Sequence, residues 1–250
     1  PLLSIIRSSS SQEVAMNDKK FNVKSTPSSE RSTLHLVDNK HNSVEVIRCD
    51  NEESVKIALK DLEKYPHVCI AGVSNAGKSS MINHLVRKRN LAKASSVPGK
   101  TRSVDLFIIN DKFVLADFPG MPSTDPQLDG QWRAKWRPLV KEYMANVVDL
   151  RAFIYIHDVR WPIAPDEVKF NKWMRRSFDI PSFLLVLSKD DKVGHNQRLM
   201  GLNNARNKLG FTDKDRHLHY CSDNSIASCR NGRRHVLRYI ENALALENRQ

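Results

Sequence analysis

The phosphate-loop motif at Gly72–Ser79 is the feature that most constrains what this 250-residue chain can fold into. The segment GVSNAGKS fits the pattern G-x-x-x-x-G-K-[ST] in full. It follows an apolar run at 67–71 that predicts a strand, and it precedes a helical pattern at 78–89. A chance match in a loop with Gly and Ser is the alternative, and the strand–loop–helix context argues against it. The motif therefore predicts a nucleotide phosphate site, without choosing between ATP and GTP.

The residue types in this loop suit a phosphate chain and its magnesium ion. Gly72 and Gly77 let the backbone turn so that successive N–H groups face phosphate oxygens. The helix that begins there adds the positive end of its dipole. Lys78 supplies a cation to the β- and γ-phosphates, and Ser79 offers a hydroxyl ligand to Mg²⁺.

A second motif, Asp117-Phe-Pro-Gly120, ends a β-rich run one hairpin after the phosphate loop. A carboxylate at Asp117 can hold the Mg²⁺ shell, and Gly120 can offer a backbone N–H to the γ-phosphate without steric hindrance. Asp-x-Pro-Gly is also a common turn sequence. Because the motif follows the phosphate loop after one hairpin, a role in binding Mg²⁺ and the γ-phosphate is favoured over a simple turn.

A third motif, Ser188-Lys189-Asp190-Asp191, follows an apolar strand pattern at 183–187 and indicates guanine recognition. It is close to the Asn-Lys-x-Asp or Thr-Lys-x-Asp sequence usual in GTP-binding proteins. Asp191 can accept hydrogen bonds from N1–H and the exocyclic amine of guanine, while the stem of Lys189 lies over the base. Ser188 keeps a hydroxyl that can tie this loop to the phosphate loop. A charged surface turn is the alternative.

Strand and helix patterns alternate along the rest of the chain, with a hairpin signal at Asn110-Asp111-Lys112. We therefore expect an α/β, three-layer P-loop NTPase domain with a six-stranded, mostly parallel sheet and helices on both faces. The predicted strands lie at 67–71, 104–109, 113–116, 152–157, 183–187 and 218–221.

The charge balance favours a polyanionic partner. Forty Lys and Arg against 28 Asp and Glu give a net charge of +12, which suits RNA; an ordinary solvated basic surface is the equal alternative. Gln131–Arg137 interleaves two tryptophans with three cations, a combination that can stack on bases and neutralise phosphates. The four-residue spacing of Trp132 and Trp136 favours instead a buried helix face for the tryptophans themselves.

The segment 1–50 is polar and rich in Ser and Lys, so we expect a flexible amino-terminal extension. Its first twelve residues are apolar and then serine-rich, which fits either the remnant of a targeting segment or a disordered tail. A mitochondrial or plastid matrix, or otherwise the cytoplasm, is the expected compartment. The four cysteines have no metal-ligand spacing, and we expect reduced thiols.

Together these motifs resemble the EngB (YihA) family of GTP-binding proteins, within the TrmE–Era–EngA–EngB–septin group. The stretches that carry the resemblance are Gly72–Asn83, Ser95–Thr101, Asp117–Gly120 and Asp158-Val-Arg160. The resemblance covers roughly residues 50 to 245. It implies a small G-protein-like domain at 51–250.

Further roles are implied by the resemblance. Thr101 would close over Mg²⁺ and the γ-phosphate, and it joins Lys78 as a catalytic residue. Asn75 would help to hold K⁺ beside the phosphates. Met121 stands where some GTPases place a water-orienting glutamine, and a thioether cannot orient water, so hydrolysis should be slow. The GTP-binding residues implied are Gly72, Val73, Ser74, Asn75, Ala76, Gly77, Lys78, Ser79, Ser80, Thr101, Asp117, Gly120, Ser188, Lys189, Asp191 and, from a weaker signal, Ser222; the Mg²⁺ ligands are Ser79, Thr101 and Asp117.

The resemblance implies a slow GTPase that acts as a switch in assembly of the large ribosomal subunit. Its partners would be GTP or GDP, Mg²⁺, and rRNA or the large subunit; we expect a monomer without a membrane partner. The alternative is a GTP-gated interaction protein in division, septation or organelle maintenance that hardly hydrolyses GTP. An ATP-using P-loop kinase is disfavoured, because no phosphoacceptor lid or catalytic-base motif is visible.

Overall fold

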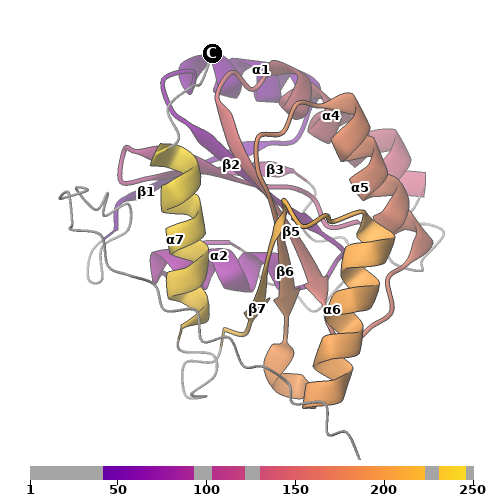
Figure 1. The fold of residues 1–250 in the computed structure, drawn as a ribbon. Coiled ribbons are helices and arrows are strands. Elements are labelled where there is room, and N and C mark those ends of the chain that lie inside the picture. Colours follow the sequence, from indigo (N-terminus) through magenta and orange to yellow (C-terminus); the bar gives the residue numbers. More distant parts are fainter. Residues whose placement is uncertain (1–41, 93–102, 122–129, 223–230, 246–250) are drawn as a thin grey trace, which may run out of the picture. The chain divides into compact units, whose positions relative to one another are not determined.

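A seven-stranded sheet forms the centre of the domain (Figure 1). The computed structural model describes residues 42–92, 103–121, 130–222 and 231–245. The strand order is β1-β3-β4-β2-β5-β6-β7, and β3 runs antiparallel to both β1 and β4 while the other neighbours are parallel. The strands are β1 Val44–Cys49, β2 His67–Gly72, β3 Val104–Ile109, β4 Phe113–Asp117, β5 Leu150–Asp158, β6 Phe183–Ser188 and β7 Arg216–Tyr220.

Helices cover both faces of the sheet and make it the middle of three layers (Figure 1). One apolar core lies under α2 and α7, and the other lies under α1, α4, α5 and α6. No helix within the described ranges combines the length and apolar character needed to cross a membrane. The helices are α1 Glu52–Asp61, α2 Lys78–Val86, α4 Arg137–Asn146, α5 Pro165–Ser177, α6 His195–Leu209 and α7 Gly232–Ala245, with a π-helix η1 at Trp132–Trp136 and a short 3₁₀ helix η2 at Asp190–Lys192.

The central strands are buried along their whole length, as the predicted three-layer fold requires. Every residue of β2 and β6 is buried, and along β2 the side chains alternate between the two cores, with Val68 and Ile70 on one face and Cys69 and Ala71 on the other. Because β2, β4, β5 and β6 are parallel, their carboxyl ends meet at one edge of the sheet. Ligands of open α/β sheets bind at that edge.

The predicted hairpin is confirmed. Asn110 and Asp111 both adopt positive φ, 51° and 53°, between β3 and β4. Two consecutive left-handed residues define a type I′ turn, whose twist matches that of the flanking strands, and Asn and Asp tolerate this conformation better than most residues.

The sheet has seven strands where six were predicted. The additional strand is β1, Val44–Cys49, in a segment assigned to the flexible extension, so the domain begins before residue 50. Only Cys49 of β1 is buried, and the other residues are exposed or half-buried, so a buried apolar pattern does not mark this strand in the sequence. Its position comes from pairing with β3 and from Asn110, which accepts a hydrogen bond from the Ser43 N–H at 2.8 Å and donates one to Asn42 at 3.0 Å.

Candidate nucleotide-binding site

The phosphate loop connects β2 to α2 and folds around the side chain of Lys78. The Lys78 ammonium donates to the carbonyl oxygens of Gly72 and Val73, each at 3.0 Å. Burial lowers the pKa of Lys78, and the nearby Asp117 carboxylate opposes that change. A phosphate oxygen offers this sheltered cation a charged acceptor in place of neutral carbonyls, and charge-assisted hydrogen bonds are the stronger kind.

Gly72 has no room for a side chain. A Cβ atom at Gly72 would lie 2.2 Å from the carbonyl oxygen of Ile156 on the neighbouring strand β5. Gly77, the residue before α2, has φ +102°, which L side chains rarely adopt. Both glycines of the motif are therefore required by the backbone path, one by a close approach and the other by its conformation.

Asp117 ends β4 beside the phosphate loop, and its carboxylate fits a magnesium site. Burial raises the pKa of the Asp117 carboxyl to about 7, while Lys78 and a hydrogen bond from Ser79 oppose the rise. Among the described residues, the buried Oδ1 atom of Asp117 has no hydrogen-bond partner. An orphaned carboxylate oxygen next to a serine hydroxyl is a hard-oxygen donor set of the kind Mg²⁺ prefers.

The described residues do not form a metal cage of their own. No group of three or more His, Cys, Asp or Glu side chains in the described part of the chain could hold a metal ion. Mg²⁺ is commonly held by one or two protein ligands together with substrate phosphates. Asp117 and Ser79 thus fit a magnesium ion that arrives with the nucleotide.

The Asp117–Gly120 segment is joined to the phosphate loop through the backbone. The Ser74 N–H donates to the Met121 carbonyl at 2.8 Å, and the Met121 N–H donates to the Gly72 carbonyl at 3.3 Å. A Cβ at Gly120 would lie 3.1 Å from the Lys78 ammonium and 2.8 Å from Ser74 Oγ. The segment therefore faces the loop where a γ-phosphate would bind.

The predicted base loop, Ser188–Asp191, begins at the carboxyl end of β6 and is hydrogen-bonded to the phosphate loop. Ser188 Oγ donates to the Ala76 carbonyl at 2.5 Å, which is the tie expected of that hydroxyl. Lys189 adopts φ 57°, and its ammonium lies 2.7 Å from the Asn75 carbonyl oxygen and 2.9 Å from Asp158 Oδ2. Two motifs separated by more than 100 residues thus form one continuous site.

The two adjacent aspartates of this loop have different roles. Asp191 is sheltered, with a side chain 7% exposed, and it contacts Lys192 at 3.0 Å. Asp190 is instead an anchor, because its carboxylate binds Arg198 of α6 at 2.6 Å and His219 of β7 at 2.8 Å. Sequence reasoning missed this anchor, since nothing in the local sequence marks partners 8 and 29 positions away.

Asp158 and Arg160 extend the site at the end of β5. The Arg160 guanidinium forms a bidentate pair with Asp158, at 2.9 and 2.7 Å. Burial alone would raise the pKa of Asp158, but hydrogen bonds from Arg160 and Lys189 leave it below its usual value. The ionised carboxylate holds Lys189 in place and so connects the D-x-R segment to the base loop.

Some predicted residues lie elsewhere. Thr101 is outside the described residues, and Ser222 is exposed just after β7; their roles stay predictions, as does the potassium role of Asn75. The expectation of reduced thiols is wrong at Cys221, which is disulfide-bonded, whereas Cys49 and Cys69 are free. The lack of metal-ligand spacing argues against a metal site, but it does not bear on disulfide formation.

Replacing Lys78 with alanine is expected to weaken triphosphate binding roughly ten- to a hundredfold, because one charge-assisted contact to the phosphates is lost. Titration of a fluorescent GTP analogue with the nucleotide-free chain measures the change. Lys88→Ala, which removes an exposed cation just after α2, is the matched control and should bind as the parent does. Equal affinity of the Lys78 variant and the parent would contradict the phosphate-loop assignment.

The fold and the site define a P-loop GTP-binding protein, and the comparisons with known proteins agree. The family described as 50S ribosome-binding GTPase matches residues 67–189. A probable GTP-binding protein EngB from Pelotomaculum thermopropionicum is 30% identical over 207 residues, which are 81% of this chain and 100% of the relative. Another, from Geobacter sp. strain M21, is 36% identical over 152 residues, 59% of this chain and 69% of the relative. The chain belongs to the EngB family of GTP-binding proteins.

Solved structures share the fold. The crystal structure of a probable GTP-binding protein EngB aligns with a TM-score of 0.55 at 19% identity, covering 72% of this chain and all of that one. Toc33 from Arabidopsis thaliana aligns at 0.53 and 11%, covering 79% and 91%. Era in complex with MgGDPNP and nucleotides 1506–1542 of 16S ribosomal RNA aligns at 0.50 and 16%, covering 75% and 59%.

Proposed function

We propose that this protein is a slow, magnesium-dependent GTP switch in assembly of the large ribosomal subunit. The observation that supports a switch is the pair of backbone hydrogen bonds between Met121 and the phosphate loop. Loss of the γ-phosphate on hydrolysis would remove the group that Gly120 faces, and the backbone hydrogen bonds would pass this change on to Met121. Segments held by the γ-phosphate and Mg²⁺ are the common element of GTP switches.

Slow hydrolysis is supported by the surroundings of Met121. Its side chain is 2% exposed and packs in the apolar core beneath the site. A thioether is a weak acceptor and no donor, so it cannot order an attacking water. We propose that K⁺ at Asn75, a partner protein or RNA, or both provide the stabilisation of the attacking water that Met121 cannot give.

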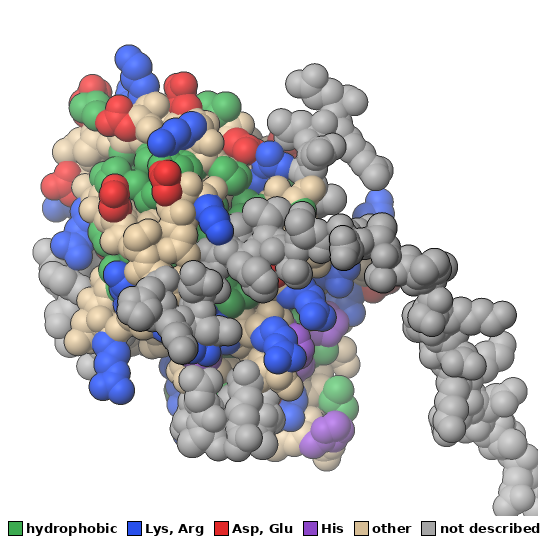
Figure 2. All heavy atoms as spheres, turned by 90° about the vertical axis from the view of Figure 1, so that its left-hand side faces the viewer, with side chains coloured by type: hydrophobic (Ala, Val, Ile, Leu, Met, Phe, Trp, Pro, Cys, Tyr) green, Lys and Arg blue, Asp and Glu red, His purple; other side chains and the backbone are tan. Residues whose placement is uncertain are grey.

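A ribosomal partner is supported by charge and by the family. The chain carries a net charge of +12. On the face shown in Figure 2, Lys and Arg side chains are spread from the top to the bottom, whereas acidic side chains gather mainly in the upper half. The family that matches residues 67–189 is described as ribosome-binding, and Era, which shares the fold, has been crystallised with a segment of ribosomal RNA.

Co-sedimentation with large ribosomal subunits tests this function. We expect more protein to pellet with subunits when it is loaded with a non-hydrolysable GTP analogue than with GDP. Parallel hydrolysis assays in K⁺ and in Na⁺ test the cation, with faster turnover expected in K⁺. Association that does not depend on the bound nucleotide, or no association, would contradict the ribosomal switch and favour a GTP-gated interaction protein of another kind.

A further inference from the structure

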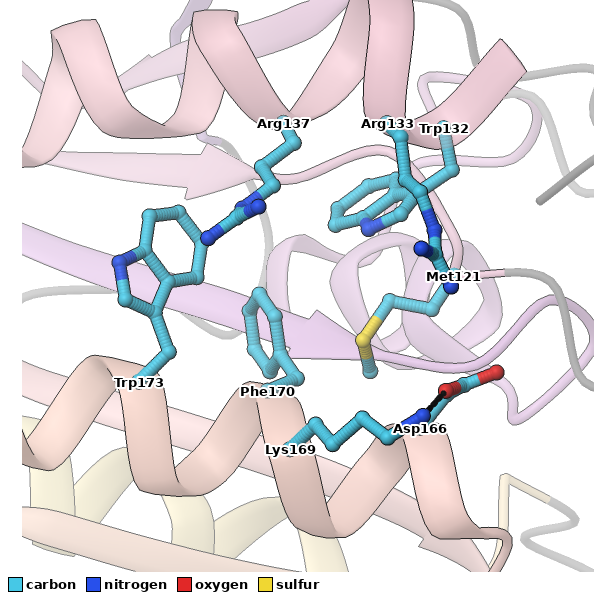
Figure 3. A pocket seen from close by; sticks show the side chains of 8 residues that line it. All are labelled: Met121, Trp132, Arg133, Arg137, Asp166, Lys169, Phe170 and Trp173. Carbon is cyan, nitrogen blue, oxygen red and sulfur yellow. Dashed lines mark hydrogen bonds and ion pairs between the residues drawn. The ribbon is translucent and has the colours of Figure 1, made fainter. Parts of the chain in front are cut away.

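A cavity of about 340 Å³ lies beside the nucleotide site, between the helical stretch η1–α4 and helix α5 (Figure 3). None of its lining residues belongs to the predicted GTP-binding set. Its size is at the lower end of the range for small-ligand pockets, which suits one compact group. The lining residues are Met121, Trp132, Arg133, Arg137, Asp166, Lys169, Phe170 and Trp173.

The interior of the cavity is aromatic. Trp132 and Phe170 are 8% and 5% exposed, and their ring centroids lie 6.0 Å apart in an edge-to-face arrangement. Phe170 and Trp173 form a second edge-to-face pair at 5.9 Å. The Arg137 guanidinium lies over the Trp173 ring, 4.9 Å from its centroid (Figure 3). The cavity therefore offers flat faces of the kind on which another planar ring can stack.

The rim is cationic. Arg133 and Arg137 come from one side and Lys169 from the other, and all three residues are exposed (Figure 3). Among the described residues that line the cavity, the one acid is Asp166, and it is paired with Lys169 at 3.0 Å. Three cations against this acid give the described lining a net charge of +2. A planar ligand with a negative charge close to its ring matches both the interior and the rim.

The local helix geometry places the arginines together. Trp132–Trp136 forms a π-helix, a widened turn that is rare and frequently found at functional sites. Both tryptophans are buried, as their spacing predicts, at 8% and 3% exposure. Arg133 and Arg137, also four positions apart, both line the cavity. The π-helix thus buries its tryptophans, while its Arg133 and the first residue of α4, Arg137, face the cavity.

The cavity is connected to the phosphate loop through Met121. Met121 lines it and is hydrogen-bonded through its backbone to Gly72 and Ser74 of the phosphate loop. A ligand that displaces the Met121 side chain also shifts the backbone that is hydrogen-bonded to the phosphate loop, and so changes the affinity for nucleotide. By thermodynamic linkage, the bound nucleotide changes the affinity for that ligand by the same factor.

We propose that this cavity binds one unpaired nucleotide of RNA. The base stacks against Trp173 and the Arg137 guanidinium, and the adjoining phosphate is bound by Arg133 and Lys169. This inference rests on the proposed function, because it names the contact through which the switch reads RNA. Bases of single-stranded RNA are commonly recognised by stacking on aromatic rings and on Arg planes, which the cavity provides.

A phosphorylated peptide fits less well. Its backbone N–H groups need acceptors, and among the side chains of the described lining residues only Asp166 carries an oxygen acceptor, which is already paired with Lys169. Stacking of a base needs only flat faces and a nearby cation.

Direct binding of a ten-nucleotide single-stranded RNA to the full chain tests the proposal. Saturating Mg²⁺ and GDP keep the phosphate loop occupied, and a 5′-hydroxyl on the RNA removes the terminal phosphate that could compete there. We expect Trp173→Leu to weaken binding about tenfold through the loss of one stack. Arg137→Gln, at an exposed position that does not threaten folding, should weaken it severalfold.

Lys172→Gln is the matched control, because it removes an exposed cation from the same helix α5 without lining the cavity. It should change RNA affinity less than about twofold at the same salt concentration. The proposal is overturned if Arg137→Gln and Lys172→Gln lose the same RNA affinity, or if duplex RNA binds as tightly as the single strand. It is also overturned if the chain binds no RNA but binds a phosphotyrosine peptide in a way that depends on Arg137. If the parent and Arg137→Gln co-sediment equally with large subunits, the switch stands and the cavity assignment fails.

Discussion

Asp191→Asn is expected to weaken GTP binding about a thousandfold, the largest effect of any single change in the base loop. The variant loses the hydrogen bond from the exocyclic amine of guanine, and the bond from N1–H goes to a neutral amide oxygen instead of an ionised acceptor; hydrogen bonds to charged groups are each worth roughly 1.5–3 kcal/mol. It also brings an amide N–H₂ against the guanine amine, and unpaired polar groups in a buried contact add to the loss. Competition titrations against a labelled GTP analogue measure the change.

The same variant should gain affinity for xanthosine triphosphate, because the asparagine amide can donate to the oxygen that replaces the amine. This gain also proves that the variant is folded. Asp190→Asn is the informative comparison: Asp190 binds Arg198 and His219 rather than facing the base, so its loss should lower stability without changing the ratio of the two affinities. Unchanged GTP affinity in the Asp191 variant would show that the base binds elsewhere.

Gly72→Ala is expected to lower the free energy of unfolding by roughly 3–5 kcal/mol, since it combines overpacking against a strand with an unfavourable backbone conformation. The added methyl would lie 2.2 Å from the Ile156 carbonyl oxygen, and φ is +154°. Neither β2 nor β5 can move away freely, because they pair along Val68–Gly72 at the centre of the sheet. Urea denaturation of the nucleotide-free chain measures the loss.

Gly194→Ala is the control for this prediction. A Cβ at Gly194 meets nothing within 4 Å, so its cost should stay within about 1 kcal/mol, the usual range for a change at a helix N-cap. If Gly72→Ala is as stable as Gly194→Ala, the close approach of the phosphate loop to β5 is not what requires a glycine there.

The alternation of strands and helices, the hairpin turn and the positions of the three motifs could be predicted from the sequence. Each depends on residues that are neighbours along the chain. Asn110 and Asp111 adopt left-handed backbone by their own preference, and the phosphate site predicted at Gly72–Ser79 depends largely on the backbone groups of that one loop. The mostly parallel sheet follows, because strands joined by helices must cross over to pair.

The phosphate loop by itself determined that this protein binds a nucleotide, and Asp191 favoured guanine, since both depend on local chemistry. The tertiary structure decided the rest. Strand β1 exists because of pairing with β3 some 60 positions away, and Asp190 is an anchor because α6 and β7 bring Arg198 and His219 to it. The cavity beside Met121 is formed where Met121, the η1–α4 stretch and α5 pack together. No local pattern encodes such contacts, because their partners meet only when the chain is folded.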